Sequence, residues 1–134
     1  MSNKKTVVIG ASENEDRYAN RAVRKLKAYG HDVVALGLRE GQIDGIKIHK
    51  DKPAVENVDT VTLYVGQQNQ PQLYDYVLSL NPKRIIFNPG AENPDFESMA
   101  EEKGIETVEA CTLVMLSIGN FWSGNITSYI FNFT

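Results

Sequence analysis

The stretch Thr6–Ser12, which reads Thr-Val-Val-Ile-Gly-Ala-Ser, decides the fold class because it joins a strand to a turn and then to a helix. Thr6–Ile9 is a run of residues that favour β-structure, and Gly10 follows it directly. Arg17–Tyr29 then carries apolar residues at helical spacing, and Gly30 comes next as a stop signal. A strand followed at once by a helix is typical of α/β domains with parallel sheets.

The alternation of strand and helix continues along the chain. Four further strands are expected, at Asp32–Leu36, Val61–Val65, Arg84–Phe87 and Glu106–Val108, and Ile46–Ile48 fits a short strand in a connection. Helices are expected from Pro71 to Leu80, over Asp95–Lys103 and over Thr112–Ile118. Because the strands are nearly continuous apolar runs, we expect helices to cover both faces of the sheet. The pattern predicts one α/β domain with a doubly wound, mainly parallel, five-stranded sheet.

Composition excludes several classes of protein. The chain has 134 residues, which suits a single core. With 23% charged residues and a net charge of −3, general nucleic-acid binding is not expected. One cysteine excludes a disulfide framework and a Cys-rich zinc site. No opening segment resembles a signal peptide and no apolar run could span a membrane, so we expect a cytoplasmic protein without a membrane partner.

Charge is unevenly distributed along the chain. Residues 1–52 contain 11 Lys+Arg and 7 Asp+Glu, whereas residues 53–134 contain 3 and 10. The basic first part suggests an anionic ligand, although solvated lysines on a helix face explain part of the excess. Ala110–Thr134 contains no charged residue. We expect a ligand-binding domain at 1–121 and an uncharged tail at 122–134 that packs on the fold or at a homo-oligomer interface.

The first turn is the strongest candidate for a phosphate site. The carboxyl ends of parallel strands share one edge of the sheet, where ligands of such folds bind. Gly10 and Ala11 permit close backbone approach, Ser12 adds a hydroxyl, and Arg17 adds a charge beside a helix N-terminus. The alternative is a tight turn in which Ser12 or Asn14 only caps the helix.

The end of the second strand separates the candidate nucleotides. No carboxylate follows Gly37 and Leu38 until Glu40, which disfavours NAD because its ribose is normally held by an acidic residue. Arg39 could instead accept a phosphate near a ribose, as in NADP or the 3′-phosphate of coenzyme A, and Lys47 could add a second charge. Both side chains also fit ordinary solvated surface positions.

Two more turns lie at the same predicted edge. Val65 ends the third expected strand and Gly66 follows it, and both could line a pocket for an apolar or amide-bearing ligand arm. Asn88, Pro89 and Gly90 follow the fourth, where Asn88 could offer an amide and Gly90 could allow backbone approach. A plain Pro-Gly turn explains the second stretch equally well.

Cys111 follows the last expected strand and precedes a helix, so we include it among the ligand-site candidates. A mixed disulfide with a thiol ligand is one role for it, and a small buried cysteine is the alternative. The two histidines, His31 and His49, are not placed to act as its base. The sequence contains no recognised catalytic motif, and we assign no catalytic residue and no metal site.

Taken together, these features resemble the small CoA-binding domain proteins, which are related to the N-terminal domain of the succinyl-CoA synthetase α subunit. The resemblance runs from about Lys5 to Phe121. Its motifs, in chain order, are Gly10-Ala11-Ser12 with Arg17, then Gly45, Lys47 and His49, Val58-Asp59, Pro71, Gly90, Asn93 and Cys111.

The resemblance implies a Rossmann-like fold that binds coenzyme A or an acyl-CoA. Residues 10–12 and Arg17 would meet the pyrophosphate, residues 37–39 the adenosine end, and residues 65–66 and 88–90 the pantetheine arm. The synthetase keeps its catalytic phosphohistidine in a separate domain, so the resemblance implies binding without catalysis. Two alternatives stay open: an NADP-dependent oxidoreductase, or a regulatory or interaction subunit with a decayed ligand site.

Overall fold

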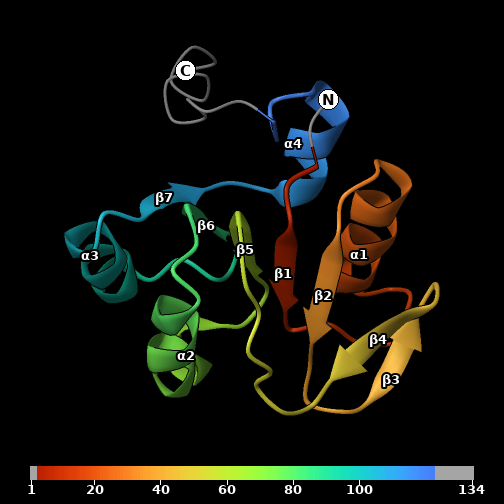
Figure 1. The fold of residues 1–134 in the computed structure, drawn as a ribbon, viewed down its shortest axis with the longest axis horizontal. Helices are drawn as coiled ribbons and strands as arrows, with labels where there is room; N and C mark the ends of the chain where they lie inside the picture. Colours follow the sequence, from red (N-terminus) through yellow and green to blue (C-terminus); the bar gives the residue numbers. More distant parts are fainter. Residues whose placement is uncertain (1–2, 123–134) are drawn as a thin grey trace.

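The computed structural model describes residues 3–122, which form an α/β domain with one seven-stranded sheet (Figure 1). The strands are β1 (Thr6–Ile9), β2 (Val33–Leu36), β3 (Gly41–Ile43), β4 (Ile46–His49), β5 (Thr60–Leu63), β6 (Arg84–Phe87) and β7 (Glu106–Glu109). The helices are α1 (Tyr18–Ala28), α2 (Tyr74–Ser79), α3 (Pro94–Glu102) and α4 (Thr112–Ile118), with short 3₁₀ turns η1 (Gln67–Asn69) and η2 (Pro71–Leu73) before α2.

The order of strands in the sheet is β3-β4-β2-β1-β5-β6-β7, and every pair is parallel except β3 with β4. The predicted doubly wound, mainly parallel sheet is therefore confirmed. The chain passes from β1 to β2 on one side and later returns to β5 on the other side of β1. The boundary between β1 and β5 is thus the switch point at which ligands of such sheets bind.

The number of strands differs from the predicted five because β3 and β4 form a short hairpin after β2. Ile46–Ile48 was expected as a short strand and lies within β4, whereas β3 was not expected. Asp44 and Gly45 form the connection with φ of 51° and 83°, as in the Asp-Gly turns typical of tight hairpins. A strand of only three residues that begins with glycine leaves little pattern to detect in the sequence.

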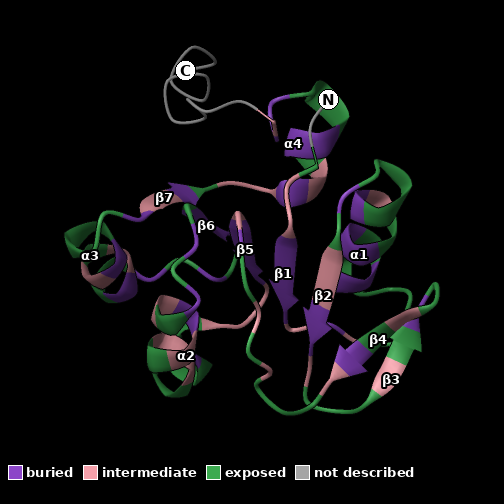
Figure 2. Cartoon of the chain, in the orientation of Figure 1, coloured by how far each residue is buried: buried purple, intermediate pink, exposed green. Residues whose placement is uncertain are grey.

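Two cores lie on opposite faces of the sheet. On one face, Val23 and Leu26 of α1 and Met115 and Leu116 of α4 pack against Val8 and its neighbours; we call this the α1/α4 face. On the other, the α2/α3 face, Val77 of α2 and Phe96 of α3 pack against the alternate strand residues. All four residues of β1, β5 and β6 are buried, as the continuous apolar runs predicted (Figure 2).

Helix boundaries fall close to the predicted ones except at Pro71. The predicted helix from Pro71 to Leu80 is divided into η2 and the shorter α2, which begins only at Tyr74. The helix predicted over Arg17–Tyr29 is α1, with Arg17 as its N-cap and Tyr29 as its C-cap. No helix within residues 3–122 has both the length and the apolar character needed to cross a bilayer.

The uncharged C-terminal stretch is described as far as Trp122. Within it, Met115, Leu116 and Phe121 are buried, so this part of the stretch contributes to the core of the α1/α4 face. Residues 123–134 lie outside the described residues, and the proposed role of the 122–134 tail stays a prediction.

Candidate ligand-binding site at the switch point

A cavity of about 210 Å³ lies where the carboxyl ends of β1, β5 and β6 meet. Three connections form its walls: the end of β1 with the start of α1, the turn after β5, and the turn after β6. The lining residues are Gly10, Arg17, Tyr18, Ala19, Tyr64, Val65, Gly66, Pro89, Gly90 and Ala91. The cavity therefore lies at the switch point between β1 and β5, where the fold predicts a ligand.

Main-chain N–H groups at the first turn and at the start of α1 differ in whether they have partners within the fold. The N–H groups of Gly10 and Ala11 both donate to Leu36 O, at 2.9 and 2.8 Å, and this joins the turn to the end of β2. Tyr18 and Ala19 are the first residues of α1, where N–H groups have no carbonyl partner within the helix and the helix dipole is positive. Tyr18 and Ala19 line the cavity, as Gly10 does, but the N–H groups of Gly10 and Ala11 are engaged with β2.

Ser12 holds the shape of the loop before α1. Its Oγ accepts from Asn14 N at 3.1 Å, and its carbonyl oxygen accepts from Asn20 Nδ2 at 2.8 Å. Asn20 is buried in the first turn of α1. Ser12 is absent from the residues that line the cavity. The alternative role as a helix cap does not apply either, because the N-cap of α1 is Arg17 and no side chain caps the helix.

Arg17 is the cationic side chain at the cavity wall. It is exposed, and within residues 3–122 no carboxylate lies within 4.0 Å of its guanidinium. Two acidic neighbours in the preceding loop are engaged elsewhere: Glu15 pairs with Arg24 at 3.7 Å, and Glu13 accepts from Gln42 N at 3.0 Å. The positive charge of Arg17 is thus available to an anionic ligand.

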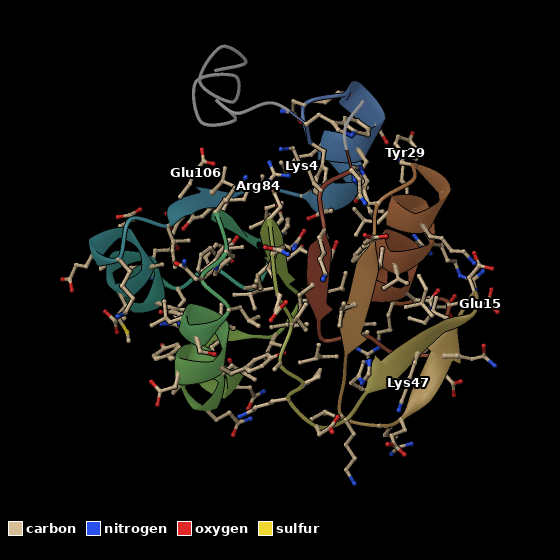
Figure 3. All side chains as sticks on the ribbon, in the orientation of Figure 1. Lys4, Glu15, Tyr29, Lys47, Arg84 and Glu106 are labelled. Atoms are coloured by element: carbon tan, nitrogen blue, oxygen red, sulfur yellow. The ribbon has the colours of Figure 1, made fainter. Side chains whose placement is uncertain are left out.

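The candidates at the end of β2 and on β4 do not line the cavity. A Cβ atom on Gly37 would lie 2.2 Å from Ala11 O, so Gly37 lets the two turns approach each other. The side chain of Leu38 is 89% exposed, and Arg39 and Lys47 are exposed as well. Figure 3 labels Lys47 on β4, in the outer part of the sheet.

Gln70 and Asn93 connect the two cavity walls that are formed by the turns after β5 and β6. Sequence patterns did not single out Gln70. Gln70 Nε2 donates to Val65 O and Ala91 O, both at 2.8 Å, so one buried amide bridges the turns after β5 and β6. Asn93 Nδ2 donates to Gln70 Oε1 at 2.9 Å and fixes its orientation. Asn93 was expected only as part of the family pattern, and a buried amide outside the strands and helices carries no periodic signal.

Asn88 uses its amide inside the fold. Its Nδ2 donates to Thr62 Oγ1 at 2.6 Å and to Leu63 O at 2.9 Å, and its Oδ1 accepts from Thr112 N at 2.9 Å. Only 1% of the residue is exposed. Asn88 therefore positions Pro89 and the rest of the turn, and its bonds leave little capacity for the ligand contact expected of it.

Cys111 is the N-cap of α4 and is half-buried, but it is not among the cavity residues. Tyr64 contacts both the cavity and the surroundings of Cys111. It lines the cavity, and its hydroxyl is buried near Cys111. Burial, and next the neighbouring Cys111, raise the pKa of the Tyr64 phenol well above its ordinary value. Tyr64 therefore presents a neutral ring to the cavity.

The cavity brings together six of the fourteen predicted site residues: Gly10, Arg17, Val65, Gly66, Pro89 and Gly90. Ala11, Ser12, Gly37 and Asn88 support its walls through the contacts above. Leu38, Arg39, Lys47 and Cys111 lie outside it. The cavity adds Tyr18, Ala19, Tyr64 and Ala91, each within two residues of a predicted residue in sequence, so wider turn boundaries would have included them.

Comparison with known proteins gives matches to a family and to solved structures. A family model described as CoA binding domain matches residues 4–117. A solved structure described as an uncharacterized protein is 48% identical, with a TM-score of 0.87 over 90% of this chain and 99% of that chain. A hypothetical protein from Pyrococcus horikoshii OT3 is 21% identical, with a TM-score of 0.74 over 82% of this chain and 79% of that chain.

A larger protein also contains the fold. The dinucleotide-forming acetyl-coenzyme A synthetase 1 of Ca. Korarchaeum cryptofilum, solved with phosphate and ADP, is 18% identical with a TM-score of 0.65. The match covers 81% of this chain but only 26% of the synthetase. A search of curated protein sequences finds no significant match. Because the family model spans residues 4–117, the chain belongs to the CoA binding domain family.

Proposed function

We propose that this protein binds coenzyme A or an acyl-CoA, with the pyrophosphate at the N-terminus of α1 in the switch-point cavity. The observation that carries the proposal is the position of Arg17. It is an exposed cation with no ion-pair partner within residues 3–122, and it shares the cavity with the first two residues of α1. A guanidinium beside the positive end of a helix is suited to phosphate oxygens.

The remaining walls suit the pantetheine arm. Val65, Gly66, Pro89 and Gly90 offer apolar surface and main-chain groups on the side of the cavity away from α1. At about 210 Å³ the cavity is smaller than the roughly 300–1,000 Å³ typical of sites that enclose a drug-sized ligand. The adenosine end would then lie outside it, toward Leu38 and Arg39, which are exposed at the same edge of the sheet.

Binding without catalysis is the role that the cavity residues support. The ionisable side chains among them are Arg17, Tyr18 and Tyr64. The raised pKa of Tyr64 keeps its phenol protonated, and an arginine does not exchange protons near neutral pH. We therefore propose a carrier, a sensor or a partner subunit rather than an enzyme.

Isothermal titration with CoA, dephospho-CoA, NADP and ATP tests the proposal. We expect CoA to bind, and Arg17→Gln to weaken it by about tenfold, the effect of losing one charge-assisted phosphate contact. Arg21→Gln is the matched control, because Arg21 lies one turn further along α1 and is not a cavity residue. Weaker binding of dephospho-CoA than of CoA would support a role for Arg39.

Three results would contradict the proposal. Binding of NADP without CoA would favour the oxidoreductase alternative. Binding of none of the four nucleotides would favour the alternative of a decayed ligand site. An equal loss of affinity in Arg17→Gln and Arg21→Gln would remove the specific role of Arg17 and leave only the general charge of α1.

A further inference from the structure

A second cavity, of about 500 Å³, lies away from the switch point and shares no residue with the first. Lys5, Val34 and His49 contribute to it from the sheet, and Pro53, Ala54, Val55 and Glu56 contribute from the connection between β4 and β5. It is a groove between the α2/α3 face of the sheet and residues 53–56. Its volume is within the range of sites for small organic ligands.

The groove exists because the crossover from β4 to β5 lacks a helix. The chain reaches β5 from β4 through residues 50–59, which contain no helix, whereas α1, α2 and α3 lie in the β1–β2, β5–β6 and β6–β7 crossovers. Val34, the β2 residue on this face, is consequently only half-buried, although β2 is an interior strand (Figure 2). In β1 beside it, all four residues are buried. An extended segment covers less apolar surface than a helix would.

The register of the strands shows which side chains share the groove. Val34 pairs with Val7, and His49 pairs with Leu36; Val7 and Leu36 both belong to the core of the α2/α3 face. Lys5 is two residues before Val7 in extended chain, so it faces the same side. Lys5 therefore lies at the amino end of the groove, Val34 in the middle, and His49 at the carboxyl end.

The groove has an apolar centre and a cation at its amino end. Val34, Pro53 and Val55 are half-buried, and Val34 and Val55 pack against the core. Within residues 3–122, no carboxylate lies within 4.0 Å of the Lys5 ammonium, whereas the neighbouring Lys4 is paired with Asp59 at 3.7 Å. The carboxylate that lines the groove, Glu56, is exposed.

The outer wall of the groove is tied to the rest of the fold. Tyr76 Oη donates to Pro53 O at 2.7 Å, and Lys52 Nζ donates to Gln72 O at 3.0 Å. Val58, which follows this wall, is buried in the core. These contacts hold the segment at a fixed distance from the sheet, so the groove is formed before any ligand enters.

We propose that this groove binds a small apolar carboxylic acid, with the carboxylate at Lys5 and the hydrocarbon part over Val34 and Val55. The acid supplies the anion that Lys5 lacks and covers the half-buried centre of the sheet face. This site is independent of the proposed CoA site, because the two cavities have no residue in common.

Amide NMR titration with 4-phenylbutyrate tests the site, and its neutral amide, 4-phenylbutyramide, is the matched probe. We expect the acid to shift the amide signals of Lys5, Val34 and Val55. Lys5→Gln should lower the affinity for the acid by about fivefold, the effect of losing one partly exposed ion pair. The variant should then bind the acid no more tightly than the amide. The main-chain bonds from Asp59 N and Thr60 N to Lys5 O do not depend on the side chain, so this variant should fold.

Lys4→Gln provides the matched control, because it removes the same charge from the adjacent residue, which is already paired with Asp59. Figure 3 labels Lys4 at the amino end of the sheet. The proposal is overturned if acid and amide bind equally well, if Lys4→Gln weakens the acid as much as Lys5→Gln, or if the shifts centre on Gly10 and Val65. Arg17→Gln should weaken CoA binding by about tenfold without affecting binding of the acid, which separates failure of one site from failure of the other.

Discussion

Asn93 and Gln70 form a side-chain amide pair in which Asn93 Nδ2 donates to Gln70 Oε1 at 2.9 Å, and both residues are completely buried. The pair leaves Gln70 Nε2 directed at the carbonyl oxygens of Val65 and Ala91. Asn93 also caps α3, since its Oδ1 accepts from Phe96 N at 3.1 Å. The cap of one helix and two walls of the ligand cavity thus depend on one hydrogen-bonded chain.

Gln70→Leu should loosen both walls at once. The change keeps a similar volume but removes the donor to the two carbonyl oxygens, and Asn93 Nδ2 keeps only its bond to Tyr74 Oη. The loss should cost about 1–3 kcal/mol in the free energy of unfolding. CoA affinity should fall as well, because the turns after β5 and β6 lose their connection. Urea unfolding and CoA titration measure the two effects. Gln67→Leu, at an exposed position, is the control, and an equal effect there would contradict the bridging role.

Gly37→Ala should destabilise the first turn through a backbone clash. The added methyl group would lie 2.2 Å from Ala11 O, so the turn after β1 must move away from β2. The two bonds from Gly10 and Ala11 to Leu36 O would stretch. We expect a loss of about 1–3 kcal/mol in thermal unfolding.

The matched substitution is Gly66→Ala, where the nearest atom is the flexible Gln68 side chain at 3.1 Å and φ is −62°. It should change the melting temperature little. If the two alanine variants melt alike, the close approach of Gly37 to Ala11 does not limit stability.

Arg84→Lys should destabilise the protein although it keeps the charge. Arg84 Nε donates to Thr60 Oγ1 and Nη2 donates to Phe121 O, both at 2.6 Å, and the guanidinium lies 4.4 Å from the centre of the Phe121 ring. A lysine ammonium cannot reproduce this planar arrangement. Burial lowers the pKa of Arg84 to about 10, so a buried lysine there would lose its proton more readily still.

Thermal unfolding compares Arg84→Lys with Lys83→Arg, the reverse exchange at the exposed neighbouring position. We expect a loss of about 1–3 kcal/mol for the first variant and almost none for the second. Equal stability of Arg84→Lys and the wild type would show that the two hydrogen bonds and the stacked ring contribute little.

Sequence patterns predicted the parts of this structure that repeat. The apolar runs of β1, β5 and β6 and the glycine after each early element fixed the parallel sheet and its ligand edge. Gln70 and Asn88 were beyond such reasoning, because their roles depend on carbonyl groups distant in sequence, such as Ala91 O and Leu63 O. The groove at Lys5 was also not predictable, since it results from a missing helix.

Glu97 should make stability fall as pH rises toward neutrality. Burial, and next the hydrogen bond with the Glu109 carboxyl, raise the pKa of Glu97 to about 7. The folded state therefore binds more protons than the unfolded state between about pH 4.5 and 7, so its stabilisation is complete below that window and is lost through it. Melting temperatures at pH 5 and pH 8 should differ less in Glu97→Gln than in the wild type.

Glu102→Gln is the control, because Glu102 is exposed at the end of α3. The interpretation fails if Glu97→Gln retains the full wild-type difference between pH 5 and pH 8. It also fails if Glu102→Gln removes that difference to the same extent.

His31 should make stability fall as the pH is lowered, the opposite of the effect of Glu97. The residue is 5% exposed, and its Nδ1 accepts from Lys4 N at 2.9 Å, so the neutral ring carries its proton on Nε2. Burial first, then the charges of Arg84 and Lys4, lower the pKa of His31 below 6.5. The unfolded state then binds more protons as the pH falls through 6.5, and the folded state loses stability below that value.

The effect of His31 on the pH dependence of stability is best measured in the Glu97→Gln background, because Glu97 cannot titrate there. In that background, urea midpoints should fall between pH 7.5 and pH 5.5, and adding His31→Phe should reduce the fall, because phenylalanine keeps the ring packed against Phe121 and Trp122 without a titrating nitrogen. Adding His49→Phe instead, at a half-buried residue of β4, should leave the slope unchanged. Were the slope with His31→Phe as steep as without it, protonation of a different group would have to cause the acid sensitivity.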